Sequence, residues 1–392
     1  MKPSFRRLRI CREAWYYLVV LGVVLGGALL REVNLLFIFA GMLAGPLLLN
    51  WRIVTSSLAR LKVKRKLPSG ICAGDLLVSH IELTNSRRKF GSWAVTVTDS
   101  LRCNGSELLT PDTFFPFIGG RKTVEGSYRC RLQHRGRYVV GPFVVKTRFP
   151  FGLFERTMTI GGTESLVVFP RLGNLSQRWL ARQHESFEGN ARAQQKYHRV
   201  EGEFYGVRDW RDGDSLRSIH WRTSARRGNW VVRQFEQPHN RDVAVLVDLM
   251  LPKVKGNGKK EQQETLETAI SFAATAVADL SRQGGANILI GTTAAPDQCI
   301  VGPSSLALMQ DVMNELAVVE SHTDDRLNRL LDTAIAKLQT QADIILISTT
   351  AINLDDETRF RDWHLNPAHR VWSRWIRTVN VSDPDLATIF QE

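Results

Sequence analysis

Arginine, acidic and tryptophan residues crowd together in residues 203–227 (EFYGVRDWRDGDSLRSIHWRTSARR), which we call the Arg/Trp segment. Guanidinium–carboxylate pairs between such residues can hold a loop in one shape, and arginines left over can bind the acidic groups of a partner. Charges and rings alternate too closely to leave an apolar stripe, so we predict short elements joined by glycine turns. The residues expected to carry these roles are Arg208, Asp209, Trp210, Arg211, Gly213, Asp214, Arg217, His220, Trp221, Arg222, Arg226 and Arg227.

Two interpretations of the Arg/Trp segment stay open. In the first, its ion pairs make it a structural clasp that docks onto the α/β sheet predicted downstream. In the second, its tryptophans and arginines form a recognition surface for a partner protein. We expect Trp221 to pack inward, because it stands between Ile219 and the small Ala225. We expect Arg211 and Arg227, each of which lacks an obvious adjacent acid on its far side, to be exposed.

A hydrolase is the enzyme class that the segment could suggest. Ser224, His220 and Asp214 are close in sequence and could in principle supply a nucleophile, a base and an orienting carboxylate. No GxSxG elbow surrounds the serine, and no phosphate-binding P-loop occurs in the sequence. We therefore predict no catalytic residue, and we expect the chain not to be an enzyme.

The elements that would position such residues follow the segment. Residues 241–392 alternate apolar runs (DVAVLVDL, ANILIGT, ADIILIST, then VWSRWIRTVNV) with helical patterns (ETLETAISFAATAVADLSRQG, SLALMQDVMNELAVV, DRLNRLLDTAIAKLQT). Continuous apolar runs are typical of parallel strands buried on both faces. This alternation predicts a doubly wound α/β domain, whose ligands would bind at the carboxyl ends of the strands. Asp248 stands at the end of the first run.

Residues 61–170 have a different pattern. Runs such as LLVSHIELTN, SWAVTVTDSL, VEGSYRCRLQ, RYVVGPFVVKT and ESLVVFP alternate with turn formers, and no helical period occurs. This favours a β-sandwich of immunoglobulin-like type. The aromatic turn at residues 150–154 is expected to plug an edge of the sandwich. Residues 171–240, which contain the Arg/Trp segment, connect this domain to the α/β domain, so the chain is predicted to be an α+β multidomain protein.

Residues 14–51 are predicted to form a transmembrane helical hairpin. The stretches 14–30 and 33–49 contain no charge, and aromatic residues flank them. Lysines and arginines precede the first stretch, in the basic N-terminus 1–13, and follow the second, so the positive-inside rule places both ends and most of the chain in the cytoplasm. This predicts a multi-pass protein of the inner (plasma) membrane. A cleaved signal peptide and a buried soluble hairpin are the alternatives.

The formal net charge of +13 raises nucleic acid as a partner. Part of the excess is next to the predicted hairpin and suits anionic lipids, and elsewhere acids are interleaved with the bases. No nucleic-acid recognition motif occurs, so we expect no nucleic acid as a partner. The five cysteines are scattered without a zinc-binding spacing, which is typical of reduced thiols. No cofactor is predicted.

The Arg/Trp segment resembles the signature of the bacterial domain of unknown function 58 family. The matching residues are Gly206-Val207-Arg208-Asp209-Trp210, Gly213-Asp214, Arg217, Ile219-His220-Trp221 and Ala225-Arg226. A second match lies upstream, at Gly136, Tyr138, Gly141-Pro142 and Pro150-Phe151-Gly152-Leu153-Phe154. The resemblance implies a membrane-tethered scaffold or adaptor that works with a MoxR-type AAA+ ATPase and a transglutaminase-like membrane protein in an envelope-associated assembly.

The resemblance also implies that the α/β domain is von Willebrand factor A-like. Such domains often hold a divalent cation on a DxSxS loop after the first strand, where hard oxygen ligands converge. Here Asp248 keeps the first position, while Met250 and Pro252 replace the two serines. The metal site is therefore expected to be absent or degenerate, with Asp248 as the only candidate ligand. The alternative function is a divalent-metal-dependent ligand-binding domain or an uncharacterised hydrolase.

Overall fold

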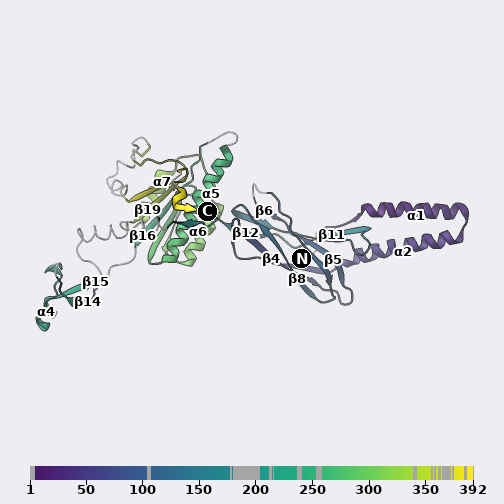
Figure 1. Cartoon of the computed structure of the whole chain (residues 1–392), viewed down its shortest axis with the longest axis horizontal. Helices are drawn as coiled ribbons and strands as arrows, with labels where there is room; N and C mark the ends of the chain where they lie inside the picture. Colours follow the sequence, from purple (N-terminus) through teal and green to yellow (C-terminus); the bar gives the residue numbers. More distant parts are fainter. Residues whose placement is uncertain are drawn as a thin grey trace. The chain divides into compact units, whose positions relative to one another are not determined.

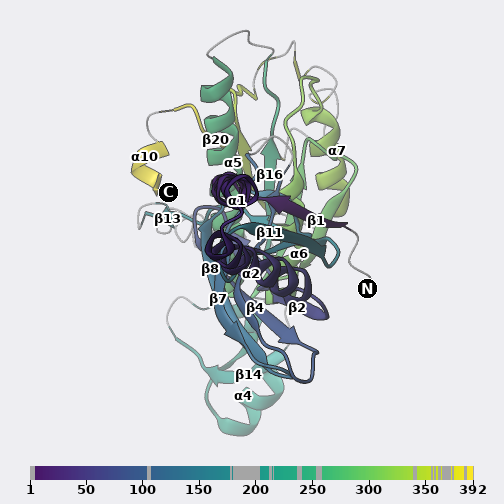
Figure 2. The same ribbon diagram turned by 90° about the vertical axis from the view of Figure 1, so that its right-hand side faces the viewer.

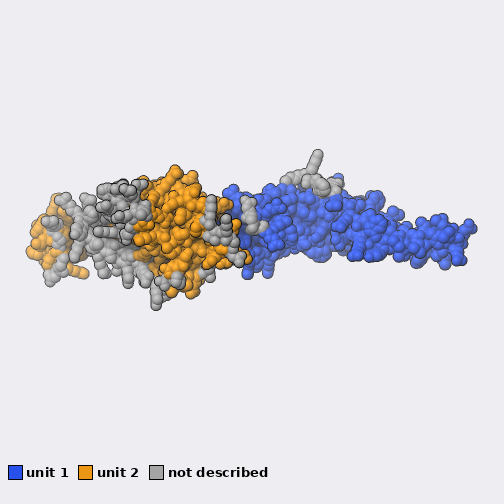
Figure 3. Space-filling model, turned by 90° about the horizontal axis from the view of Figure 1, so that it is seen from above, with its two compact units in different colours: residues 1–169 blue, residues 170–392 orange. Residues whose placement is uncertain are grey.

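The structure is a computed structural model that describes residues 5–103, 107–176, 179, 204–211, 214, 216–235, 241–252, 258–338, 342–354, 356, 359–360, 363, 372, 375–383 and 386–391. Contacts divide the chain into two compact units, Met1–Phe169 and Pro170–Glu392, which Figure 3 colours separately. Apolar helices, several β-sheets and a helix-covered sheet occur in one chain, which confirms the mixed α+β class.

Two apolar helices form a hairpin in the first unit. Helix α1 spans Arg12–Arg31 and α2 spans Asn34–Ser57, and both are long and apolar enough to cross a membrane. Figure 2 shows them side by side, nearly end on. Most of their apolar side chains are exposed, unlike those of a helix in a soluble core. The turn between them is short, with Glu32 in the left-handed region at φ 50°.

The rest of the first unit consists of strands in three sheets, ordered β1-β11-β10-β5-β7, β3-β12-β9-β6 and β2-β4-β8. Neighbours are antiparallel apart from the short β3–β12 pair. The inward-facing residues of all three sheets build one core, which includes Leu77, Ile81, Val97, Phe115 and Val145. The strands are β1 Phe5–Ile10, β2 Leu61–Lys66, β3 Ile71–Cys72, β4 Leu76–Asn85, β5 Ser92–Thr98, β6 Leu101–Arg102, β7 Asp112–Ile118, β8 Thr123–Arg131, β9 Gly136–Val140, β10 Phe143–Thr147, β11 Phe154–Ile160 and β12 Glu164–Phe169.

A buried ion pair joins these sheets. Arg65 of β2 donates to Asp99, which follows β5, through Nε (2.9 Å) and Nη2 (2.6 Å), and neither side chain is exposed. Tyr128 of β8 donates to the same carboxylate at 2.8 Å. The guanidinium also donates to the Val140 carbonyl of β9 at 3.4 Å and lies 4.2 Å from the Phe143 ring centroid. Each of the three sheets therefore contributes to one polar cluster within the core.

The N-terminus and the aromatic turn connect the hairpin to the strands. The sequence predicted a basic tail for residues 1–13, but β1 pairs with β11 along its whole length. Beyond β1, Cys11 N–H donates to the Leu153 carbonyl at 2.9 Å, and Phe154 N–H donates to Asn50 Oδ1 of α2 at 3.1 Å. Leu153 and Phe154 are buried against the hairpin, where Ala14 and Val54 also lie, rather than plugging a sandwich edge.

The second unit is built on a five-stranded sheet of order β18-β17-β16-β19-β20, of which β16 and β19 are labelled in Figure 1. Strands β16, β17, β19 and β20 are parallel, and the edge strand β18 is antiparallel. Helix α7 packs on one face of β16 and α5 contacts the same strand from the other face. Gly291 of β17 is required by this packing, because a Cβ there would lie 2.8 Å from Leu330 of α7. The elements are β16 Arg241–Asp248, α5 Gly258–Gln283, β17 Ala286–Thr292, β18 Cys299–Pro303, α6 Leu306–Val318, α7 Leu327–Lys337, β19 Asp343–Ser348 and β20 Ile376–Asn380.

Smaller elements complete the second unit. The Arg/Trp segment forms β14, a single 3-10 turn and helix α4, and β15 pairs with β14 as an antiparallel partner. Near the other end, β13 pairs with β21, and the side chains of Ser271 and Thr275 in α5 hydrogen-bond backbone atoms of residues 171 and 173. The bounds are β13 Asn174–Leu175, β14 Phe204–Asp209, η1 Leu216–Ser218, α4 Trp221–Arg227, β15 Val231–Phe235, α10 Leu386–Ile389 and β21 Phe390–Gln391.

Candidate functional site

A polar cluster surrounds Asp248 at the carboxyl end of β16. Ligands of parallel sheets bind at the carboxyl ends of the strands. The carboxylate is buried, and its Oδ1 accepts from Met250 N–H (3.3 Å) and from Thr293 Oγ1 (3.2 Å). Its Oδ2 accepts from Ser348 Oγ at 3.4 Å. The carboxyl ends of three neighbouring strands, β17, β16 and β19, thus supply donors to one carboxylate.

Thr293 connects Asp248 to His322. Nδ1 of His322 lies 2.8 Å from the Asp324 carbonyl oxygen, which can only accept, so Nδ1 carries a hydrogen. Nε2 of His322 lies 2.6 Å from Thr293 Oγ1, and this oxygen also accepts from Leu249 N–H at 2.9 Å. The single hydroxyl hydrogen of Thr293 can go to Asp248 or to His322, but not to both.

Two proton arrangements satisfy all of these contacts. In one, a doubly protonated His322 donates to Thr293, which donates to an ionised Asp248. In the other, a protonated Asp248 donates to Thr293, which donates to a neutral His322. Burial raises the pKa of the Asp248 carboxyl, which favours its protonated form. The geometry can therefore pass one proton between a partly exposed histidine and a buried carboxylate.

A fixed positive charge also faces this carboxylate. Nη2 of Arg359 lies 3.8 Å from Asp248 Oδ2, and the same guanidinium donates to Asp325 through Nε (2.6 Å) and Nη2 (3.2 Å). The hydrogen bonds from Arg359 lower the pKa of Asp325. Among the described residues, no group of three or more His, Cys, Asp and Glu side chains has the spacing of a metal site. A guanidinium thus lies on the side of Asp248 where a cation would be expected.

The sequence identified only part of this cluster. It placed Asp248 at the end of a strand, as found. It missed Thr293, His322 and Arg359, because each is 45 or more residues from Asp248 along the chain. The one available signal was the polar Thr292-Thr293 pair directly after an apolar run, which is where a parallel strand presents its carboxyl end.

Replacing Asp248 with asparagine should change how stability depends on pH. Burial raises the pKa of the folded carboxyl. Its contribution to the free energy of unfolding is therefore fully present below the unfolded pKa of about 3.9, and it is lost as the pH rises through the folded pKa. Relative to wild type, Asp248→Asn should therefore gain stability towards neutral pH. Urea titrations of the second unit at several pH values would measure this. A constant difference between the two proteins across the titration would contradict it.

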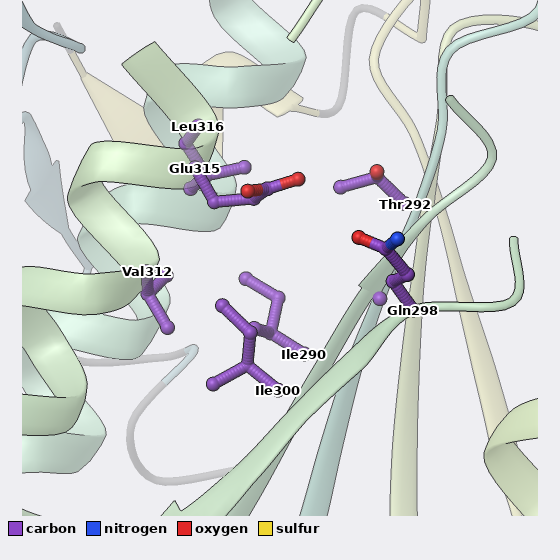
Figure 4. Close-up of a pocket in the computed structure, with 8 residues that line it drawn as sticks. Ile290, Thr292, Gln298, Ile300, Val312, Glu315 and Leu316 are labelled. Atoms are coloured by element: carbon purple, nitrogen blue, oxygen red, sulfur yellow. The ribbon is translucent and has the colours of Figure 1, made fainter. Parts of the chain in front are cut away.

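A small cavity lies between the sheet and α6 in the same unit (Figure 4). Its volume is about 40 Å³, and Ile290, Ile300 and Val312 line its apolar part. Thr292 and Glu315 contribute polar atoms to its wall. A space of this size holds ordered water and excludes a cofactor.

The Arg/Trp segment is organised by one internal ion pair. Arg208 of β14 binds both carboxylate oxygens of Asp214 at 2.7 Å, and the Arg211 N–H donates to Asp214 at 2.9 Å. The hydrogen bond from Arg208 is the main cause that lowers the pKa of Asp214. This fork closes the turn between β14 and the 3-10 turn. Gly213 and the side chain of Arg217 lie outside the described residues.

Trp221 does not lie as predicted. Trp221, which was expected to pack inward, is 63% exposed, because it occupies the first position of a seven-residue helix whose buried residue is Ser224. Trp210 instead makes the aromatic contact of the segment, edge to face with Trp230 at 5.5 Å between centroids. The predicted exposure of Arg211 and Arg227 is confirmed. Asp209, Arg222 and Arg226 are exposed as well.

The three residues considered as a hydrolase triad have separate partners. Nδ1 of His220 accepts from Thr223 N–H at 3.2 Å and caps α4. Ser224 is buried, and its Oγ accepts from Val231 N–H at 2.9 Å. Asp214 is held by Arg208, as described above. Each side chain therefore has a local structural role in capping the helix, joining it to β15 or closing the turn.

A parallel sheet with a polar edge, a distinct Arg/Trp segment and two apolar helices define a mixed α+β protein with helices that could span a membrane. Residues 206–381 match the model of the family described as "Protein of unknown function DUF58", which confirms the family resemblance.

Individual relatives are more distant. An uncharacterized protein, YeaD, from Bacillus subtilis (strain 168) is 26% identical over 135 residues, which cover 34% of this chain and 33% of that protein. The matched stretch therefore spans about a third of that relative. Among solved structures, the CARDB domain of a Pyrococcus furiosus protein is 15% identical and covers 28% of this chain and 91% of that one, with a TM-score of 0.19. The sporulation control protein Spo0M of Bacillus subtilis is 11% identical, covers 39% and 58%, and has a TM-score of 0.18.

Proposed function

We propose that the chain is a membrane-tethered adaptor, anchored by the α1–α2 hairpin, whose Arg/Trp segment recognises an acidic surface of a partner protein. The observation that carries this proposal is the exposure of Arg211, Trp221, Arg222, Arg226 and Arg227 on one short stretch of chain. The Arg208–Asp214 ion pair already holds the turn of the segment, so the other arginines are not needed for that turn. Arginine and tryptophan are the residues most enriched at interface hot spots.

The helix α4 supports recognition over a clasp. Arg222 and Arg226 are four residues apart on a short helix, a spacing at which like charges repel and destabilise by a few tenths of a kcal/mol. Arg226 and Arg227 gain part of this back from the helix dipole, but Arg222 in the first turn does not. A carboxylate-rich partner would offset the repulsion. By family resemblance, we propose a MoxR-type AAA+ ATPase as this partner, together with a transglutaminase-like membrane protein in the same assembly.

The tether follows from how the hairpin joins the first unit. Strand β1 precedes α1 and β2 follows α2, and both strands belong to the same compact unit. If the two helices cross a membrane, their outer ends must therefore lie on one side of it. The flanking lysines and arginines favour the cytoplasmic side of the inner membrane.

We further propose an immunoglobulin-like sandwich for the strands of the first unit and a von Willebrand factor A-like domain for the sheet of the second. The shared core of the sheets supports the first. The sheet order, with an antiparallel edge strand and Asp248 at the end of the central strand, supports the second. The rival function, a divalent-metal-dependent ligand-binding domain or hydrolase, has less support, because Arg359 already faces Asp248.

Charge reversal of the exposed arginines should abolish partner capture while sparing the fold. We expect the double variant Arg211→Glu/Arg227→Glu to recover the partner at least tenfold less from membranes, since charge pairs at interfaces steer and fix binding. Trp221→Ala should also weaken capture, by about 2 kcal/mol for an interface hot spot, without lowering the melting temperature. The measurement is an affinity pull-down with the tagged full-length chain.

A matched control is Arg282→Glu, which reverses an exposed charge near the end of α5. It should recover the partner as well as wild type does. Normal recovery with both Arg211 and Arg227 reversed would rule out the Arg/Trp segment as the recognition surface. Loss of recovery with Arg282→Glu would show that net charge alone is responsible.

A further inference from the structure

The outer face of the sheet β1-β11-β10-β5-β7 in the first unit carries exposed aromatic rings. Phe149 stacks on Trp93 at 5.6 Å between centroids, and Trp93 contacts Phe117 at 4.2 Å. Phe114 is 60% exposed and Phe151 is 51% exposed. An apolar surface of this kind on a folded domain marks an interaction site.

The same face carries cations around a hollow. Lys146 and Arg148, at the end of β10, line an open hollow of about 550 Å³ together with Thr96 and Phe114. Each cation has a carboxylate neighbour: Lys146 Nζ lies 3.7 Å from Asp112, and Arg148 Nε donates to Glu155 at 2.5 Å.

Strand β1 adds positive charge to this face. Arg7 pairs with Thr157 and Arg9 pairs with Glu155 in the β1–β11 ladder, and both arginines are exposed. Successive side chains of a strand alternate between faces, so Arg7 and Arg9 share one face of the sheet with Glu155 and Thr157. Lys146 pairs with Thr157 across the next ladder and so belongs to the same face. Four cations therefore lie near three carboxylates: Asp112, Glu155 and Glu13 of α1, whose charge also acts on Arg148.

This face adjoins the end of the hairpin. The turn that holds Phe149 and Phe151 runs directly into Leu153 and Phe154, which are buried against α1 and α2. Their contacts include Val54 and Asn50, which follow the uncharged stretch of α2. In Figure 1, β11 lies beside the ends of both helices. A residue at this level of a membrane-spanning hairpin lies at the boundary between lipid and water, where aromatic and basic side chains accumulate.

We propose that this aromatic and basic face binds the surface of an anionic phospholipid bilayer, with lipid phosphates at Lys146 and Arg148 and the rings of Phe114 and Phe151 at the headgroup level. This inference rests on the proposed membrane tether. The cations of this face complement the negative charge of lipid phosphates, and the face adjoins the hairpin. Both observations favour a bilayer as the binding partner. The β domain then lies against the membrane as well as being anchored to it.

The test uses the full chain in lipid nanodiscs of phosphatidylcholine, with or without phosphatidylglycerol. A photoreactive benzophenone side chain is placed at position Phe114 or Phe151, and lipid attached after illumination is measured by mass spectrometry. Matched control positions are Leu76 and Val139, which are 49% and 46% exposed on the other two sheets. We expect lipid capture at Phe114 and Phe151, several times that at the controls, and more of it with phosphatidylglycerol.

Charge variants complete the test. Lys146→Gln, alone and with Arg148→Gln, should lower capture from phosphatidylglycerol discs by about two- to fivefold, since each basic residue near an anionic surface contributes up to about 1 kcal/mol. Arg129→Gln, which removes an exposed cation from β8, should leave capture unchanged. Equal capture at Leu76 and Phe114, or no dependence on lipid charge, would overturn the proposal.

Two further outcomes are distinguishable. If added inorganic phosphate abolishes capture at Phe114, the hollow holds a free phosphate and the bilayer proposal is wrong. If the chain does not enter nanodiscs at all, the tether fails, and this inference fails with it. Entry into the discs without capture at either position would reject the lipid-binding face alone.

Discussion

Truncating Asp99 to alanine should destabilise the first unit by about 3–5 kcal/mol, the cost of leaving a buried charge without its partner. The Arg65 guanidinium is unexposed and binds Asp99 through two nitrogens. Its other polar contacts are a carbonyl at 3.4 Å and Glu164 Oε1 at 3.5 Å, which are longer than the bonds to Asp99. Hydrogen exchange of the β2, β4 and β5 amides in detergent-solubilised full chain would measure the loss.

The control for this prediction replaces both partners. A double variant, Arg65→Met/Asp99→Leu, removes the two charges together and should recover most of the stability, because an apolar pair avoids the desolvation penalty. The backbone of Gly141 lies so close to Arg65 that a Cβ at position 141 would be 2.9 Å from the guanidinium. This close approach limits how bulky the replacement for Arg65 can be. An Asp99→Ala protein with wild-type exchange rates would show that the cluster does not hold the sheets together.

Phe272→Ala should cost the second unit about 3–5 kcal/mol, the range for removing a large buried ring. Phe272 of α5 is fully buried and meets Trp179 at 5.4 Å and Phe390 at 5.3 Å, both edge to face. The ring thus joins α5 to two segments that are far away in sequence. Urea unfolding followed by tryptophan fluorescence would measure the loss, and Glu264→Ala on the exposed side of α5 is the control. If Phe272→Ala lowered the free energy of unfolding by less than about 1 kcal/mol, the cavity would collapse without penalty and the prediction would be wrong.

The sequence predicted the second unit more completely than the first. Its strands are continuous apolar runs because both faces of the sheet are covered, so the pattern is strong and local. The one strand of that sheet missed, β18, is a short edge strand with half-exposed residues. In the first unit, β1 and β2 were missed because their arginines and lysines suggest a membrane flank, and β7 was missed because Pro116 interrupts its pattern.

The candidate sites depended on contacts that a sequence pattern does not contain. The Arg208–Asp214 pair was among the combinations predicted, since both residues lie within six positions of each other. The inward position of Trp221 was wrong, because Trp221 and Ala225 lie on the exposed side of α4, whereas Ile219 is buried before the helix begins. The Asp248–Thr293–His322 chain joins three loops at one sheet edge, so its members become neighbours only after the sheet has formed.

The pairing of β1 with β11 determines the order in which the hairpin and the β domain can be completed during synthesis. Residues 5–10 leave the ribosome well before their partner strand, which ends at Ile160, about 150 residues later. At synthesis rates of roughly 5–20 residues per second, the N-terminal strand waits for many seconds without its partner. During this time the proposed membrane hairpin emerges, and β1 must stay on the side where the β domain will fold. Closing the β1–β11 ladder is then the step that joins this hairpin to the finished domain.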